Sequence, residues 1–433
     1  MTDELARMAR RLVVAAVLAC AAVAFAAGAA QAVVTTVDGH RLSYQPLRGS
    51  YAHGQAQPNV RSHAKPSKKG KGVTWHGGPV MTSNTNYAIY WDPSGAPAYP
   101  AGYEAGIDKW FGDLEHDSGG LLNTDSVLAQ YHGEGSTFAN YDSQFAGALT
   151  DADPYPPSGC SSAPKCLTRE QLEAELASFV QANSLPADLT HMYFLLTPEG
   201  VESCFEEQGH ECSAGAKHAF YCMYHGYIEL PKGGTIIFAD APYVPGLRCG
   251  DEDNTPNNKF SDEELAGGLV HEHSEGVTDP TLQAWYENAK GNEVADKCRT
   301  FEEATEYGAP LGTAEDGSKY NQVLDGDKYW YQQMWSNEAG ACRQRALELP
   351  AVTKLKPKAG PGSGGTVVTI TGSGFTSTST VAFGGVEAGG VVFNSPTSIT
   401  ATSPKGSGTV DVRVTNALGT SPVVAKDHFK YKK

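Results

Sequence analysis

Two residues with metal-binding side chains lie four positions apart in the segment VHEHSEGVTDPTLQAWYENAKGNEVADKC, residues 270–298. They are His271 and Glu275, and residues at this spacing share one face of a helix. Zinc accepts both a histidine nitrogen and a carboxylate oxygen, so the pair can supply two ligands to one ion. Glu272 follows the first ligand, and His273 points away from the shared face. The spacing indicates a metal site, against the alternative of a solvated charged helix face.

A second motif downstream supports this interpretation. HEHSEGVTDP followed by WYENAKGNEVAD resembles the thermolysin-like pattern, in which a second helix supplies a Glu ligand from a short Asn-Glu motif. The resemblance implies that His271, Glu275 and Glu293 bind zinc and that Glu272 is the general base that polarises a bound water. The sequence departs from the pattern twice: Glu275 replaces the expected second His, and the downstream Asp falls one residue early.

Three further sets of polar residues are candidates for binding. His225, in YCMYH, is either a structural histidine or the missing nitrogen ligand or transition-state donor. His273 fits a surface residue, or one that supports a ligand, better than it fits a ligand. The acidic run at 251–254, with Asn257 and Asn258, offers oxygen ligands for calcium. The Gly and terminal Glu of an EF-hand are absent, which favours a solvated acidic loop.

A helix must carry the His-Glu pair. The SDEE motif at Ser261 is a capping-box pattern, which predicts a helix that begins at Asp262 and runs through Glu275 until Pro280 prevents continuation. Two glycines, 267–268, precede the pair by one turn and would let another element or a substrate approach closely. Asp279 is expected to stabilise the turn that follows the helix.

The surrounding sequence alternates strand-like and helical runs. Buried strands are predicted at residues 87–91, 192–197 and 235–240. The TREQ motif at Thr168 predicts a capped helix that runs to about Ala182. These elements describe a mixed α and β domain, and the metallopeptidase resemblance implies an α+β zincin-like one.

A wider resemblance covers residues 73–345. The blocks WHGGPVMTSNTNYAIYW, YCMYHG, HEHSEGVTDP, WYENAKGNEVADKC and YWYQQMWSNEAGAC are similar to the plant exordium (phosphate-induced) proteins and their secreted bacterial relatives. Plant members of that family are cell-wall or apoplastic proteins without a firmly assigned reaction. The resemblance therefore implies secretion and leaves the chemistry open.

The chain has 433 residues, 40% hydrophobic and 19% charged, which is enough for one large core and a second, smaller domain. Residues 1–32 have the layout of a secretory signal, with Arg10 and Arg11 before an apolar run and cleavage expected after Ala32. An uncleaved anchor or a lipid on Cys20 fits less well. We expect contact with the membrane only through this signal.

Eight cysteines remain after the signal, and an even number in an exported protein predicts disulfides. Pairing within the chain is expected to be local for the first four. The candidates are Cys160 with Cys166, Cys204 with Cys212, and, in unassigned pairs, Cys222, Cys249, Cys298 and Cys342.

Charge divides the chain into regions. Residues 33–72 carry a net charge of +6, lack a hydrophobic period and are interpreted as a basic linker or pro-segment without a fold. Residues 73–350 carry 14 basic and 43 acidic residues, a net charge of −29. Such an acidic domain excludes nucleic acid as a partner and favours solubility outside the cell or cation binding.

The sequence changes after Pro350 to short alternating strands rich in Gly, Ser, Thr and Val. GPGSGGTVVTITGSGF, VAFGG, SPTSITATSP, GTVDVRVTN and HFKY together resemble an IPT/TIG domain, an immunoglobulin-like β-sandwich, over residues 351–433. That family implies a spacer or binding module.

Together these observations predict a secreted protein with an α+β zincin-like, exordium-like domain at 73–348 and an immunoglobulin-like IPT/TIG domain. The first function hypothesis is zinc-dependent hydrolysis of extracellular peptides or proteins. The alternative is a non-catalytic cell-wall, matrix or carbohydrate-binding protein, in which the same metal site is structural or vestigial.

Overall fold

The computed structural model describes residues 33–37, 40–47, 72–288, 291–299, 303–395, 397–416 and 418–432. The predicted signal, residues 1–32, and most of the basic segment lie outside these ranges. Among the helices that are described, none is both long and apolar enough to cross a bilayer.

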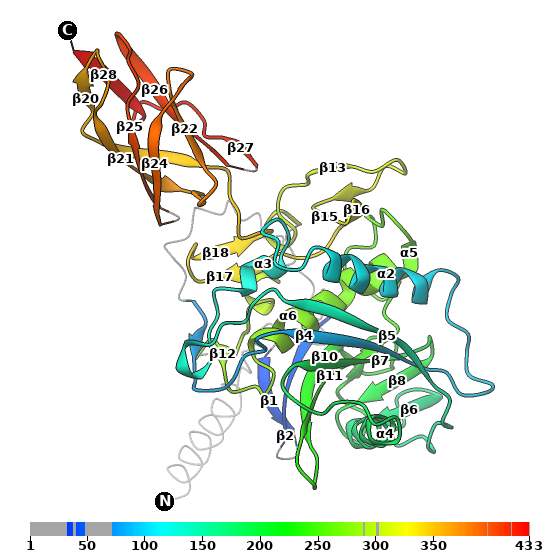
Figure 1. Cartoon of the computed structure of the whole chain (residues 1–433). Coiled ribbons are helices and arrows are strands. Elements are labelled where there is room, and N and C mark those ends of the chain that lie inside the picture. The colour runs from blue at the N-terminus through cyan, green and yellow to red at the C-terminus, as the bar shows by residue number, and fades with distance from the viewer. Residues whose placement is uncertain are drawn as a thin grey trace, which may run out of the picture.

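One large sheet organises the first domain (Figure 1). Its strands follow the spatial order β5-β4-β7-β11-β10-β9-β8-β6, and β2 pairs with β10 and with β1. The strands are β1 (Val33–Val37), β2 (His40–Pro46), β4 (Asn84–Trp91), β5 (Ser143–Asp151), β6 (Lys165–Thr168), β7 (His191–Thr197), β8 (Val201–Cys204), β9 (Cys212–Ser213), β10 (Ala219–Glu229) and β11 (Thr235–Pro242). The three predicted strands are thus confirmed as β4, β7 and β11.

Successive side chains of the central strands point to opposite faces of the sheet, and both faces are apolar and covered. In β4, Ala88 and Tyr90 enter one hydrophobic cluster, whereas Ile89 and Trp91 enter the other. Helix α4 packs on the second cluster, and α2, α5 and α6 pack on the first. The helices are α2 (Tyr103–His116), α3 (Asp125–Leu128), α4 (Arg169–Ala182), α5 (Lys259–Glu264), α6 (Val270–Thr278) and α7 (Glu303–Glu306).

The architecture confirms the sequence analysis only in its coarser form. The first domain is mostly β-sheet with few helices, and a zincin-like arrangement stays a prediction. Helix α4 begins as expected, because the Thr168 hydroxyl accepts a hydrogen bond from the backbone N–H of Gln171 and the Gln171 side chain caps Thr168 in return.

The beginning of the basic segment is folded, which corrects the expectation that residues 33–72 have no fold. Strands β1 and β2 form an antiparallel hairpin, and β2 adds to β10 with Ser43 opposite His225. Leu42 and Tyr44 face the hydrophobic cluster beneath α4, so alternate residues of β2 are apolar and buried. The short apolar run in β2 lacked the length to be recognised against the charged residues around it.

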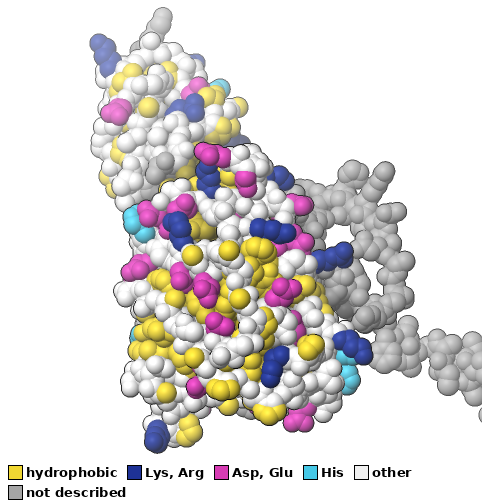
Figure 2. Space-filling model, turned by 90° about the vertical axis from the view of Figure 1, so that its right-hand side faces the viewer, with side chains coloured by type: hydrophobic (Ala, Val, Ile, Leu, Met, Phe, Trp, Pro, Cys, Tyr) yellow, Lys and Arg dark blue, Asp and Glu magenta, His cyan; other side chains and the backbone are white. Residues whose placement is uncertain are grey.

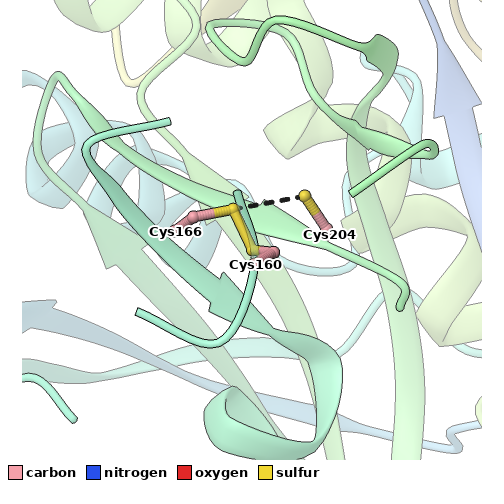
Figure 3. A group of neighbouring side chains, drawn as sticks. All are labelled: Cys160, Cys166 and Cys204. Atoms are coloured by element: carbon pink, nitrogen blue, oxygen red, sulfur yellow. Dashed lines mark hydrogen bonds between the residues drawn. A yellow bond between two sulfur atoms is a disulfide. The ribbon is translucent and has the colours of Figure 1, made fainter. Parts of the chain in front are cut away.

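Four disulfides are present: Cys160–Cys166, Cys204–Cys212, Cys222–Cys249 and Cys298–Cys342. The two predicted local pairs are confirmed. These two lie against each other where β6 pairs with β8, with 3.3 Å between the Sγ atoms of Cys166 and Cys204 (Figure 3). Because these sulfurs are already in disulfides, the corner is a covalent staple and offers no thiolate to a metal.

A second, separate β-sandwich forms the C-terminal end of the chain (Figure 1). Its two sheets run in the orders β19-β21-β25-β24 and β20-β28-β26-β22-β23, with β27 beside β26. The strands are β19 (Ala351–Lys356), β20 (Ala359–Pro361), β21 (Val367–Ser373), β22 (Thr380–Phe383), β23 (Val386–Glu387), β24 (Gly389–Ser395), β25 (Ser398–Thr402), β26 (Thr409–Asn416), β27 (Gly419–Thr420) and β28 (His428–Lys432). Valine, isoleucine and phenylalanine side chains such as Ile370, Phe383 and Val414 fill the space between them.

Short hairpins complete the first domain around its helices. They pair β12 with β3, β13 with β14, β15 with β16 and β17 with β18. Their bounds are β3 (Thr74–Trp75), β12 (Trp285–Tyr286), β13 (Gly312–Thr313), β14 (Lys319–Tyr320), β15 (Gln322–Leu324), β16 (Asp327–Tyr329), β17 (Met334–Ser336) and β18 (Ala341–Arg343).

Part of the acidic excess of the first domain is internal. Acidic side chains are scattered over the face shown in Figure 2, among neutral and hydrophobic ones. Fifteen others are buried among the described residues between 73 and 350. An unpaired buried charge is costly, so the buried carboxyl groups around α6 require partners that offset their charge.

Candidate metal centre

Helix α6 holds the predicted pair in the interior. The helical segment that contains α6 begins with α5, where the Asn258 side chain accepts hydrogen bonds from the backbone N–H groups of Phe260 and Ser261. The helix therefore begins three residues before the predicted Asp262, because Asn258 is the cap and Ser261 lies inside the first turn. Its C-terminal boundary is Asp279, whose carboxylate accepts from two backbone N–H groups of the following turn, as expected for a turn residue.

A π-helical turn, η2 (Leu265–Leu269), separates α5 from α6. Single π turns interrupt α-helices frequently at functional sites. A Cβ on Gly268 would lie 2.6 Å from the Gln45 side chain of β2 and from the Met223 sulfur of β10. Glycine at this position is thus required by the close approach of β2 and β10, as the Gly-Gly pair predicted.

The remaining members of the site come from β10 and from the loop before η3 (Asp296–Cys298). His225 lies on β10, Glu293 lies on that loop, and Asp296 is the first residue of η3. The loop is fixed at Cys298 by the disulfide to Cys342, and it is capped internally where the Glu293 N–H donates to the Asp296 carboxylate.

The acidic and histidine side chains form two groups that share Glu275. In the first, His271 Nε2 lies 3.2 Å from Glu275 Oε1 and 3.0 Å from Asp296 Oδ1. In the second, His225 Nε2 lies 3.8 Å from Glu293 Oε2, and His225 Nδ1 lies 4.0 Å from Glu275 Oε2. The ligand atoms within each group lie within 4.8 Å of one another, so each can surround one metal ion.

Glu272 is oriented by His225. Its Oε2 lies 3.0 Å from His225 Nδ1, and the backbone of Gln45 is also close enough to lower its pKa. Burial raises the pKa of Glu272 well above its usual range, and the charge of Glu275 raises it further. Burial likewise raises the pKa of Glu293, whereas it lowers that of His225. Both effects favour the neutral form of a group removed from water.

His271 has the opposite shift. Burial alone would lower its pKa, but the charges of Glu275 and Asp296 raise it well above its ordinary value. Its other nitrogen, Nδ1, lies 3.1 Å from Gln332 Oε1, and the Gln332 amide donates to the carbonyl of Ala295. Gln332 therefore sets the ring orientation and directs Nε2 toward the two carboxylates.

Many polar atoms of this cluster have no hydrogen bond of standard geometry within the described part of the chain, although His271 Nε2 and Asp296 Oδ1 lie at ion-pair distance. Buried polar atoms are nearly always paired, so a concentration of exceptions points to a ligand. The atoms are His225 Nε2, His271 Nε2, Glu272 Oε1, Glu275 Oε2, Asp279 Oδ2, Glu293 Oε1 and Oε2, and Asp296 Oδ1. These donors, nitrogen and carboxylate oxygen, match the ligand preferences of zinc.

The structure brings together three of the predicted ligands and one of the two additional candidates. His271 and Glu293 both neighbour Glu275, in different groups, and His225 belongs to the second group. His273 does not join them: its ring is buried beside Trp110, and Nδ1 lies 3.2 Å from Asp125. The expectation of a surface position for His273 is therefore wrong, because the whole helix is enclosed.

Asp296 and Gln332 are members of the site that sequence reasoning missed. Asp296 appeared in the sequence only as the Asp that falls one residue early in the downstream motif, and in the structure it opens the 3₁₀ turn η3. Gln332 lies 61 residues after the histidine that it orients, so local spacing carried no signal for it.

The residues considered for calcium make contacts within the protein. Asp251 accepts hydrogen bonds from the backbone of Asp253 and from the indole of Trp330. Asn257 and Asn258 both donate from the backbone to Asp262. These contacts fold the loop onto the helix start.

Comparison with known families identifies the C-terminal part. Residues 350–431 match the family model of the IPT/TIG domain. The chain therefore carries an IPT/TIG domain. No curated protein matches the chain, and neither the exordium-like resemblance nor the thermolysin-like pattern has support from these matches.

Similar solved structures align over short parts of the chain. The extracellular region of plexin A4 is 22% identical over 26% of this chain and 14% of its own, with a TM-score of 0.18. An auxiliary nutrient binding protein from Bacteroides ovatus is 25% identical over 20% of this chain and 21% of its own, with a TM-score of 0.16. A gamma-CGTase from Alkalophilic bacillus clarkii is 26% identical over 30% of this chain and 18% of its own, with a TM-score of 0.18. The chain spans less than a quarter of the length of each.

Proposed function

We propose that this chain is a secreted, metal-dependent hydrolase that acts on extracellular peptides or proteins, with zinc bound around Glu275, either with His271 and Asp296 or with His225 and Glu293. The observation that carries the proposal is the concentration of buried nitrogen and carboxylate atoms around Glu275, several of them without a hydrogen bond of standard geometry. Glu272, Glu275, Asp279, Glu293 and Asp296 bring five buried carboxyl groups close to two histidines. A divalent cation would supply the positive charge that so many buried carboxylates require.

Each neighbouring residue has a separate role in this proposal. Zinc, when bound, would polarise a substrate carbonyl and lower the pKa of a water molecule. Glu272 would accept the proton of that water, since its Oε2 lies 3.0 Å from His225 Nδ1 and it belongs to neither ligand group. His225 holds the Glu272 carboxylate in place, and Gln332 holds His271. Asp296 neighbours His271 Nε2 and would complete the first group.

The finer classification, exordium-like and zincin-like, is part of the same proposal. It is supported by the convergence of a helix bearing His271 and Glu275 with a downstream loop bearing Glu293, segments that the sequence pattern predicted to act together. The carboxylate in place of a second histidine would make the metal a weaker Lewis acid.

Secretion is supported by covalent chemistry. Four disulfides in one chain are typical of proteins that fold in an oxidising compartment. The layout of residues 1–32 as a signal is consistent with this location.

Metal content and turnover together test the proposal. Elemental mass spectrometry on the mature chain is expected to find bound zinc that is lost in His271→Ala and Glu275→Ala. Glu272→Gln is expected to retain the metal and lose peptide hydrolysis by at least about 100-fold, the usual contribution of a general base. Glu264→Gln is the matched control, because Glu264 is equally buried, lies about two turns earlier, and accepts a hydrogen bond from the Val244 N–H. A metal-free, folded wild type would refute the proposal.

One observation favours a second candidate, a cell-wall, matrix or carbohydrate-binding protein with a structural metal. Every side chain of the cluster is buried, with His225, Glu272, Glu275 and Glu293 at 0% exposure. A structural metal site is typically closed, whereas a catalytic one keeps a position open. Retention of zinc with no hydrolysis in any form of the chain would favour this candidate.

A further inference from the structure

Strand β2 is the element that lies over the reactive residues. It runs antiparallel to β10, with Tyr44 opposite Tyr224 and Ser43 opposite His225. Residues 42–46 are all buried, and Figure 1 shows the β1–β2 hairpin (blue) near β10. The closed state of the site thus depends on a segment from the N-terminal side of the basic residues 48–71.

The contacts of β2 reach the residues around the cluster. Ser43 pairs opposite His225, whose Nδ1 lies 3.0 Å from the proposed base Glu272, and β2 packs against α6. The Gln45 side chain lies against Gly268, one turn before His271. An extended backbone therefore lies across the cluster in the position where a peptide would meet these residues.

The way β2 is held resembles the binding of a peptide. Its backbone pairs with β10, and Arg299 donates two hydrogen bonds to the carbonyl of Pro46. The Ser43 hydroxyl and both polar atoms of the Gln45 side chain have no partner of standard geometry within the described residues. Main-chain pairing with pockets for alternate side chains is how strand addition captures extended peptides.

Alternation along β2 divides its side chains into two sets. Leu42 and Tyr44 enter the apolar cluster, where Tyr44 contacts the rings of Phe205 and Phe220. Ser43 and Gln45 face the metal-binding cluster. The edge of β10 therefore selects an apolar residue, then a small polar one, then an aromatic one.

We propose that the edge of β10 at Tyr221–His225 is a strand-addition site for an extended peptide with this apolar, small, aromatic pattern, and that β2 occupies it as a built-in inhibitor. The inference rests on the proposed function of the same site. Because residues 33–71 contain no cysteine, cutting the chain after β2 leaves the hairpin held by noncovalent contacts alone. A proteolytic cut in the basic segment would then free the site.

The test uses the full mature chain with a recognition sequence for a specific protease in place of residues 56–62. The chain is cut, the N-terminal fragment is removed by gel filtration, and binding of a labelled peptide HRLSYQP, residues 40–46, is measured. We expect the cut chain to bind the peptide and the uncut chain to bind it at least tenfold more weakly. A peptide with Leu42→Ala should lose at least tenfold in affinity.

Three results would overturn the inference. They are equal binding of the peptide to the cut and uncut chains, unfolding of the first domain when the fragment leaves, and retention of the fragment even when Leu42→Asp is added to it. Metal content and hydrolysis, measured on the same samples, separate this inference from the function. Peptide binding without metal or hydrolysis would refute only the function, and equal hydrolysis before and after release would refute only the role of β2.

Discussion

The interior around α6 and the interior of the IPT/TIG domain are built on opposite principles. The IPT/TIG core is filled by apolar side chains such as Val368, Ile399 and Phe429. Around α6, carboxylates and imidazoles are buried with many atoms unpaired. Burial of apolar area stabilises a fold without any ligand, whereas buried charges destabilise it until they are paired. If the proposed metal site is occupied, the first domain therefore gains more stability from the cation than the IPT/TIG domain does.

Removal of metal should therefore separate the two domains. A site saturated at about 1,000 times its dissociation constant stabilises the fold by about 4 kcal/mol. Calorimetry with and without a chelator is expected to lower the unfolding temperature of the first domain and leave the IPT/TIG transition in place. An equal shift of both transitions, or of neither, would contradict the comparison.

The disulfide that fixes the metal-binding region should contribute more stability than one that lies away from it. Loss of Cys298–Cys342, with a sequence separation of 44, should cost about 4 kcal/mol in the chain-entropy description, against about 2 kcal/mol for Cys160–Cys166, with a separation of 6. Double Cys→Ser variants compared by denaturant unfolding check this order. Only the Cys298–Cys342 variant should also weaken zinc binding, because this bridge fixes the loop that carries Asp296.

A smaller effect is expected from the side chain that orients His271. Gln332→Ala should lower zinc affinity about 10- to 100-fold, since it removes the hydrogen-bond partner of a ligand without removing a ligand. Gln333→Ala is the control, because that side chain donates to Thr305 and does not contact the cluster. Competition with a chromogenic chelator measures both, and equal affinities would remove Gln332 from the site.

The smallest effect concerns pH and lies outside both interiors. Burial, with Asp151 and Asp153 nearby, raises the pKa of Glu175 to about 7. The folded state then holds this proton more tightly than the unfolded state, so its contribution to stability falls as pH rises from about 4.5 to about 7. Glu175→Gln should stabilise the chain at pH 8 by at most about 1 kcal/mol, given partial exposure, and have no effect at pH 4. Urea unfolding at both pH values, in chelator, measures this, and a destabilised variant at pH 8 would contradict it.

Features that depend on neighbouring residues in the chain could be predicted from the sequence. The capping box at Thr168, the buried strands and the i, i+4 pair on α6 all depend on residues within one or two turns. The start of α5 was predicted at Asp262 and lies at Lys259. Asn258 and Ser261 can both cap a helix, and the Asn258 side chain is the cap in the structure because it accepts from two backbone N–H groups.

Long-range pairing explains the remaining gaps. The placement of Ser43 against His225 joins segments 182 residues apart, and no periodicity records it. The same holds for Gln332 beside His271. The sequence thus identified the helix of the site and its downstream loop, but it left out the strand that covers them and the amide that orients them.

The π turn between α5 and α6 has a consequence for the genetics of this chain. Each residue of an α-helix advances the rotation about the axis by about 100°. A π turn takes up one more residue than an α turn over nearly the same rotation, so deleting Gly267 would leave His271 and Glu275 close to their present phase. Deleting Ser274, inside α6, would instead turn Glu275 by about 100° relative to His271 and separate the pair. A single codon deletion is therefore tolerated in the π turn and destructive in the helix that follows it.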